Sequence, residues 1–345
     1  MNTSSSRTVL APTSASTVPG PKRNNSSTTA LKNVARSPVF PIAAALVLVC
    51  VVMFILTPNF LTASNLTNIV TQSSIVGIAA VGATFVIITG GIDLSVGSNI
   101  ALSGMIAATL VSGGVNGYLG IAIAIAISIF IGAFNGASVT WLRLAPFIVT
   151  LAVLGMARGL TLQISEGQSV YGLPTSFTWL GGGTLFGLPV PIYLTVVVFA
   201  IGYILSSRTT FGHKVYAVGG NREAARLAGI RDGRVLLAVY AFAGLCAGLA
   251  AVILVGRLGS ATPTAATGLE LQVIAAVVIG GTSLFGGKGS LIGTFVGVLL
   301  IGVINNGLTL LNVSPFWVQF MQGALIFLAV LLDSYNTRRV FRSKS

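Results

Sequence analysis

The ionisable residues of this 345-residue chain are few, and this restricts the chemistry that it can perform. The chain contains six acidic residues and a single histidine, His213. General acid–base catalysis and nucleophilic triads both depend on groups of such residues, and so small a set leaves little material for either. The composition therefore argues against an enzyme with an acid–base active site of its own.

The glycine-rich stretch around Lys288 resembles a phosphate-binding loop only in part. That motif requires a glycine where this chain has Thr282, and a serine or threonine directly after the lysine, where it has Gly289. We therefore expect that the chain does not hydrolyse nucleotides itself. The energy for any active process must come from a partner or from an ion gradient.

Polar side chains inside the long apolar runs are the candidates for a passage, because polar groups at membrane depth are costly and commonly functional. Most are neutral amides and hydroxyls, which can exchange hydrogen bonds with a neutral, hydroxyl-rich solute. The residues proposed to line this path are Gln72, Asp93, Asn99, Asn135, Arg158, Asn305 and Asn306. The alternative for each of them is a hydrogen bond that only holds helices together.

Two of these candidates carry charge and also have simpler explanations. Asp93 precedes a new apolar run, where either Asp93 or Ser95 would cap the next helix. Arg158 lies about a dozen residues into its predicted helix, so it would either extend toward the membrane surface or pair with Glu166. Glu270 is predicted to lie at the outer edge of its span.

Glycine pairs end two of the apolar runs in a similar way, at Gly90-Gly91 and at Gly280-Gly281. In transport proteins such pairs break helices beside a substrate path. The simpler interpretation is a turn at the cytoplasmic end of each run.

Residues 206–234 form the most polar segment within the apolar region, with six basic residues and His213. At its centre we predict one short helix, with Asn221 as the N-cap and Gly229 as the left-handed stop. So short a helix is unstable alone in water and must dock on something. We interpret it as a coupling helix that receives force from a soluble partner; the alternative is an ordinary charged loop. The residues assigned to coupling are Arg222, Glu223, Ala224, Ala225, Arg226, Leu227 and Gly229.

The spacing within this helix predicts how its faces are used. Ala224, Leu227 and Ala228 are expected to form a small apolar docking face. Arg222 and Arg226, four residues apart, form a basic edge. Glu223 lies in the first turn, where the helix dipole favours an anion.

The elements that must position these residues are long apolar helices. Apolar residues make up 54% of the chain, charged residues only 7%, and 42 residues are glycine. A soluble domain carries about a quarter charged residues, and small residues allow close helix packing in lipid. The sequence therefore predicts an all-α polytopic membrane protein. Cys50 and Cys246 lie inside apolar runs and are interpreted as core residues, not as a disulfide or a metal site.

Ten runs are long enough to be interpreted as transmembrane helices. They are Val39–Thr57, Asn65–Thr89, a third run that ends near Val111, and residues 118–140, 146–165, 189–205, 235–256, 271–283, 290–310 and 316–332.

The basic residues predict the orientation, because they are retained on the cytoplasmic side of the membrane. With ten spans both termini lie on one side, and that side holds all 19 basic residues except Arg158 and Arg257. We therefore predict that both termini are cytoplasmic. The same distribution explains the formal net charge of +13 without a nucleic-acid partner.

Three parts follow along the chain. Residues 1–38, rich in Ser, Thr, Asn and Pro, are predicted to be a disordered basic cytoplasmic tail. Residues 39–333 form the transmembrane domain with the cytoplasmic loop 206–234. Residues 334–345 form a second basic cytoplasmic tail.

Three segments resemble a known transporter family. They are TGGIDLSVGS (Thr89–Ser98), FGHKVYAVGGNREAARLAGI (Phe211–Ile230) and AAVVIGGTSLFGGKGSLIGT (Ala275–Thr294). In the second, Glu223-Ala-Ala followed after three residues by Gly229 is similar to the core of the coupling loop in permease subunits of ABC importers, without the Leu-Pro that often ends it. From about residue 40 to 333 the chain resembles the ribose-type sugar permeases of the branched-chain amino acid/ribose permease family.

This resemblance implies a permease dimer, cytoplasmic ABC ATPase domains that are often two fused in one polypeptide, and an extracytoplasmic sugar-binding protein that delivers the substrate. The predicted function is the permease subunit of an ABC importer in the cytoplasmic (inner) membrane, surrounded by lipid. It would move a ribose-like monosaccharide by alternating access driven by the partner ATPases, with no cofactor or metal of its own.

Other functions stay open at this stage. An ion-coupled secondary carrier would need no ATPase but should bury a titratable or ion-binding cluster. A membrane enzyme is disfavoured by the shortage of acid–base residues. Within the family, branched-chain amino acids or nucleosides are alternative cargoes.

Overall fold

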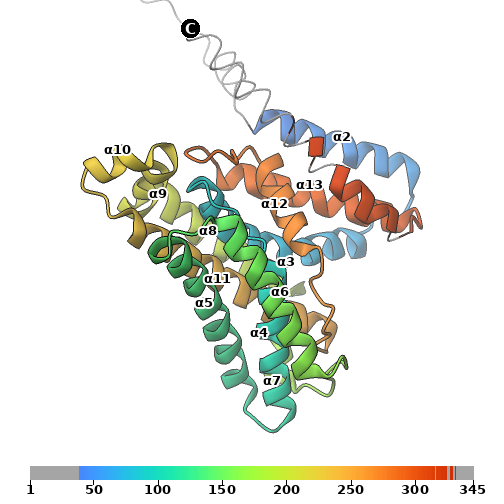
Figure 1. Cartoon of the computed structure of the whole chain (residues 1–345). Helices are drawn as coiled ribbons and strands as arrows, with labels where there is room; N and C mark the ends of the chain where they lie inside the picture. The colour runs from blue at the N-terminus through green and yellow to red at the C-terminus, as the bar shows by residue number, and fades with distance from the viewer. Residues whose placement is uncertain (1–38, 315, 325–326, 329–330, 332–345) are drawn as a thin grey trace, which may run out of the picture. The chain divides into compact units, whose positions relative to one another are not determined.

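The computed structural model describes residues 39–314, 316–324, 327–328 and 331. This part of the chain is helical, with one short antiparallel hairpin formed by β1 (Thr184–Leu185) and β2 (Leu188–Pro189) (Figure 1). The tails predicted at residues 1–38 and 334–345 lie outside the described residues.

Six helices are long and apolar enough to cross a membrane: α3 (Ala63–Ile88), α5 (Gly117–Trp141), α6 (Pro146–Ser165), α8 (Val190–Arg208), α11 (Asp232–Leu258) and α13 (Leu291–Leu310). Three shorter apolar helices accompany them: α2 (Phe40–Leu56), α4 (Val96–Ser112) and α12 (Leu269–Ile279). Each coincides with one of the predicted spans. The last predicted span, 316–332, is helical at residues 316–324 and is described only in part. The all-α polytopic membrane class is confirmed.

The helix α12 is the shortest of these. Its 11 residues rise about 16 Å, roughly half of the ~30 Å apolar core of a bilayer. It begins after Gly268 (φ 77°) and ends at Ile279, two residues before Gly281 (φ 89°), and both left-handed positions suit glycine. The predicted end at residue 283 was therefore too late.

The helix α11 lies at the centre of the packing and contacts α3, α4, α5 and α7, the last being a short helix over Thr175–Gly182. Glycine allows its close approach to α5, because a Cβ on Gly244 would collide with the backbone of α5 at Ser128. The Ser128 hydroxyl donates a hydrogen bond to the Gly244 carbonyl at 2.7 Å across the same contact.

Two short helices connect α8 to α11: α9 (Thr210–Gly220) and α10 (Arg222–Leu227). The sequence predicted only the second. The first forms because the Thr209 hydroxyl accepts a hydrogen bond from the Gly212 N–H, and because Val215 and Val218 are buried. In Figure 1 these two helices lie at the end of the bundle opposite α7.

Candidate functional site

The helix α10 has the cap and the stop that its sequence predicts. The Asn221 Oδ1 atom accepts a hydrogen bond from the Ala224 N–H at 2.9 Å. Glu223 lies in the first turn, and Gly229 adopts a left-handed conformation with φ 81°. The short helix and its local capping are therefore confirmed.

An ion-pair cluster ties α10 to the beginning of α11. Arg226 donates two hydrogen bonds to Asp232, from Nε to Oδ1 at 2.9 Å and from Nη2 to Oδ2 at 2.8 Å. Arg222 donates to the Oδ2 atom of the same carboxylate. The hydrogen bond and then the charge of Asp232 raise the pKa of Arg226 above its usual value. The basic edge predicted for this helix is thus an internal anchor.

Asp232 was missed by the sequence interpretation. The available signal was an acidic residue placed just before a long apolar run and six positions after Arg226. Only a turn back at Gly229 brings that carboxylate to the two arginines.

The helix α10 packs on the rest of the chain through one small side chain. Ala225, only 4% exposed, is the residue that joins the main apolar core. Leu227, predicted to dock, is 91% exposed, and Ala224 and Ala228 are exposed too. Within the chain α10 rests on α9 and α11 through Ala225, so the docking face predicted from the spacing is left exposed and its role toward a partner stays a prediction.

Three chain segments meet next to α9 through glycine backbone. The Gly287 N–H donates a hydrogen bond to the Ile88 carbonyl at the end of α3, at 2.8 Å. A Cβ on Gly286 would lie 3.0 Å from the backbone nitrogen of Gly90, and one on Gly219 would collide with Ile88. Both glycine pairs noted in the sequence thus end their helices in turns, and the segments that follow them are in direct contact. We call this contact the glycine junction (residues 88–91, 219–220 and 285–287).

An inner polar cluster lies at the break between α3 and α4. The Asp93 Oδ1 atom accepts hydrogen bonds from the Ser95 N–H at 2.8 Å and from the Ser95 hydroxyl at 2.6 Å. The Asn135 amide donates to the same hydroxyl oxygen at 2.8 Å. Ser95 is the N-cap residue of α4, as predicted for one of the two candidates, but its side chain makes no cap hydrogen bond. Asp93 does not cap the helix and instead closes the turn before it.

Several buried polar atoms in this inner cluster have no hydrogen-bond partner within the described part of the chain. They are Asn99 Oδ1, Asn135 Oδ1 and the Tyr240 hydroxyl. The Asn99 amide nitrogen does donate, to the Ser128 carbonyl at 3.2 Å. Buried polar atoms are normally paired, so three unpaired ones in one region require an explanation.

Arg158 binds a loop and not Glu166. Its Nη1 atom donates to the carbonyls of Pro263 and Ala265, at 2.8 Å and 3.0 Å, between α11 and α12. Glu166 is exposed at the left-handed end of α6. The pairing predicted for Arg158 was therefore wrong, because the loop folds back against α6.

Glu270 is more enclosed than a position at the membrane edge implies. Its Oε1 atom accepts a hydrogen bond from the Gly268 N–H at 3.2 Å, and its Oε2 atom is buried. A Cβ on Gly97 would collide with that Oε2 atom. The carboxylate thus packs against the first turn of α4.

An outer amide cluster joins α3, α12, α13 and the segment after residue 316. Asn65 and Asn306 exchange two amide hydrogen bonds, at 3.0 Å and 2.9 Å. The Asn305 amide donates to Gln272 at 3.3 Å and accepts from Gln322 at 3.0 Å. Gln72, exposed on α3, lines a small cavity beside Gln272 and Asn305.

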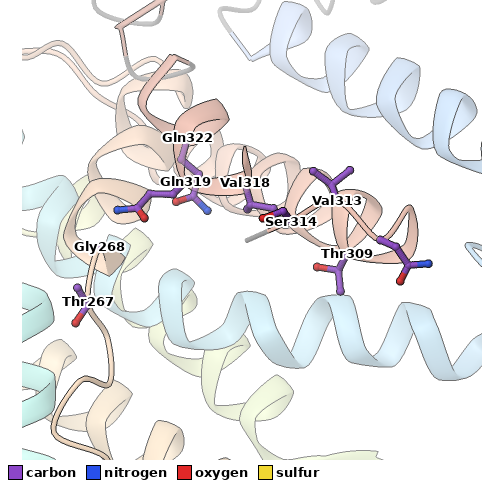
Figure 2. A pocket seen from close by; sticks show the side chains of 9 residues that line it. Thr267, Gly268, Thr309, Val313, Ser314, Val318, Gln319 and Gln322 are labelled. Atoms are coloured by element: carbon purple, nitrogen blue, oxygen red, sulfur yellow. The ribbon is translucent and has the colours of Figure 1, made fainter. Parts of the chain in front are cut away.

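A larger pocket of about 670 Å³ opens beside this cluster (Figure 2). Its lining contains no charged residue and consists mainly of hydroxyl and amide side chains: Thr267, Gly268, Thr309, Asn312, Val313, Ser314, Val318, Gln319 and Gln322. The volume is within the range typical of small-molecule sites. Sequence analysis did not single out this pocket, because short polar residues in turns have no distinguishing pattern.

The seven path candidates therefore separate into two groups. Asp93, Asn99 and Asn135 belong to the inner cluster, and Gln72, Asn305 and Asn306 to the outer one. Arg158 belongs to neither.

Comparison with known proteins identifies the family. Residues 65–330 match the family described as "Branched-chain amino acid transport system / permease component". The chain belongs to this family. It is therefore a membrane transport permease, as its apolar helices and buried polar clusters indicate.

Individual relatives cover nearly the same region. The ribose import permease protein RbsC of Bacillus subtilis (strain 168) is 47% identical over 290 residues, which cover 84% of this chain and 90% of the relative. RbsC of Escherichia coli (strain K12) is 45% identical, with 84% and 92% covered. The D-allose transport system permease protein AlsC of the same strain is 42% identical, with 79% and 84% covered. No solved structure matches the chain.

Proposed function

We propose that this permease is the transmembrane subunit of an ABC importer that carries a ribose-like monosaccharide across the cytoplasmic membrane. The observation that carries the proposal is the outer pocket, whose lining offers amides and hydroxyls and no charge. Such groups suit a neutral polyol, whereas a charged substrate would call for a fixed countercharge. The names of two similar permeases, which refer to ribose and D-allose, support the same substrate class.

The proposed path runs from the outer pocket to the inner cluster. Gln322 lines the pocket and is hydrogen-bonded to Asn305, which gives the first step inward. At the inner cluster, the unpaired oxygens of Asn99 and Asn135 and the Tyr240 hydroxyl can bind the hydroxyl groups of a passing sugar. We interpret these unpaired atoms as hydrogen-bonding groups that remain available to the substrate, or to the water that replaces it.

The proposed coupling route begins at α10. The exposed Leu227 offers an apolar contact to a cytoplasmic ATPase, while the two arginine–Asp232 ion pairs fix the helix to α11. A displacement of α10 and α9 would reach the ends of α3 and α12 through the glycine junction. The sequence of this chain has no complete phosphate-binding loop, so the ATP would be hydrolysed by the partner. The movement of that partner would then drive alternating access.

The wider assembly is also part of the proposal. We propose ten spans with both termini cytoplasmic, because this arrangement places nearly all basic residues on one side. A second permease copy, a cytoplasmic ATPase and an extracytoplasmic sugar-binding protein would complete the importer.

Reconstitution in liposomes tests the function directly. Liposomes with permease, ATPase and binding protein should accumulate ribose or a related pentose only when ATP is present on the ATPase side. The matched control is the purified permease alone under a proton or sodium gradient, which should not accumulate sugar. Gradient-driven accumulation by the permease alone would instead support the ion-coupled carrier.

A further inference from the structure

A second cavity, of about 270 Å³, lies beside α10. It is lined by Val139, Thr140, Arg143, Leu144, Pro146, Arg222 and Arg226. The charged residues of this lining are three arginines, which come from two separate segments, the connection between α5 and α6 and the helix α10. We call it the arginine cavity.

The arginine cavity keeps a positive charge after its neighbours are counted. Arg222 and Arg226 share the carboxylate of Asp232, and Glu223 also attracts Arg226. Arg143 makes no hydrogen bond or ion pair within the part of the chain that the structure describes. Three guanidinium groups therefore face at most two carboxylates, and an anion is the ligand that this excess favours.

The surroundings of the cavity are apolar and exposed. Trp141, the last residue of α5, is 74% exposed, and Leu142, Phe147 and Ile148 around the same connection are exposed as well. An exposed tryptophan at the end of a transmembrane helix is typical of the membrane–water interface. The cavity thus lies where a lipid headgroup would meet the protein, with apolar side chains next to it for the acyl chains.

We propose that the arginine cavity binds the phosphate group of an anionic phospholipid. Guanidinium groups match phosphate oxygens with two parallel hydrogen bonds, which a single lysine cannot provide. Basic pockets between transmembrane helices are known binding places for anionic headgroups. Because two of its arginines also anchor α10, a bound phosphate would hold the coupling helix from the membrane side. The proposal requires that this end of α5 lies at the membrane–water interface, and it is independent of which substrate is transported.

The test compares two charge-removing variants of the full chain, purified in detergent. Arg143→Gln removes the cavity arginine that makes no hydrogen bond or ion pair within the described residues. Glutamine replaces arginine with another long polar side chain at this left-handed position (φ 54°). Lys214→Gln removes an exposed basic residue on α9 that does not line the cavity. The measurements are the shift in melting temperature on adding phosphatidylglycerol and the number of bound lipids by native mass spectrometry, with phosphatidylcholine and inorganic phosphate as separate controls.

We expect phosphatidylglycerol, and not phosphatidylcholine, to raise the melting temperature of the unmodified chain and of Lys214→Gln. Arg143→Gln should bind phosphatidylglycerol about fivefold more weakly, the loss expected for one basic residue at an anionic surface. If Arg143→Gln is itself less stable, a third variant, Arg143→Lys, keeps the charge without the planar guanidinium group. Its number of bound lipids should lie between those of the unmodified chain and of Arg143→Gln.

Three results would overturn the proposal. An equal lipid response in Arg143→Gln and Lys214→Gln would show that the cavity is not the site. Stabilisation by inorganic phosphate equal to that by phosphatidylglycerol would assign the arginine cavity to a free anion. If Arg143→Gln lost ATPase binding and kept its lipid response, the arginine cavity would be assigned to a carboxylate of the ATPase.

Discussion

The segment around α10 and the proposed polar path through the helices differ in how their polar groups are paired. Around α10 the polar groups are charged, and Asp232 is saturated by two arginines. Along the path most groups are neutral, and several buried oxygens have no partner in the described residues. Saturated ion pairs hold an element in one position, whereas unpaired amides and hydroxyls remain available to a solute. This difference is the one expected if, as we propose, α10 transmits movement as a rigid unit and the path binds its solute only briefly.

The largest expected effect is a charge placed under α10. Ala225→Glu should abolish sugar uptake, because Ala225 is 4% exposed and a carboxylate there would be buried without a partner. The measurements are uptake in cells and recovery of the ATPase with the tagged permease. The matched change Leu227→Ser, at a side chain 91% exposed, should leave the melting temperature unchanged but lower ATPase recovery, and uptake with it. Normal ATPase recovery with both variants would contradict a coupling role for α10.

Removal of the shared carboxylate should have the next largest effect. Asp232→Ala should reduce uptake several-fold, since both arginines of α10 would lose their anchor. The free energy of unfolding should fall only slightly, because the two arginine side chains are 45% and 57% exposed and water screens such pairs. Lys214→Gln is the control, since Lys214 is exposed on α9 and makes no ion pair in the described structure. Equal uptake by both variants would show that the anchor is dispensable.

On the path, the Asp93 variants separate geometry from charge. Asp93→Asn should keep uptake near normal, because an amide oxygen can still accept the two hydrogen bonds from Ser95. Asp93→Ala should lower uptake, since Ser95 and Asn135 would lose their alignment. The measurement is uptake at matched amounts of membrane-inserted protein. A collapse with Asp93→Asn would mean that the negative charge itself is required.

The smallest effect is expected at the outer pocket. Gln319→Leu should raise the sugar concentration for half-maximal uptake by about threefold to tenfold, the usual range for loss of one or two hydrogen bonds. ATPase recovery should not change, because this pocket is distant from α10 in the chain and shares no lining residue with the arginine cavity. Val318→Leu, in the same lining, should have little effect. An unchanged sugar dependence would remove Gln319 from the path.

The sequence by itself determined the class of the protein and its local structure. Long apolar runs require helices in a membrane, and the span predicted at 146–165 has the bounds of α6, Pro146–Ser165. The cap at Asn221 and the stop at Gly229 were also predictable, because capping depends on residues within a few positions of each other. The family followed from motifs that are continuous in the sequence.

Only the tertiary structure decided which polar groups are partners. The pairing of Asp232 with α10, the loop carbonyls bound by Arg158, and the contact of Gly286 with Gly90 all join separate segments. In an apolar helix, periodicity identifies no single buried face, since lipid and core both accept apolar side chains. The choice of Ala225 over Leu227 as the buried residue, and the gathering of scattered hydroxyls and amides into one pocket, therefore depend on how the helices pack against each other.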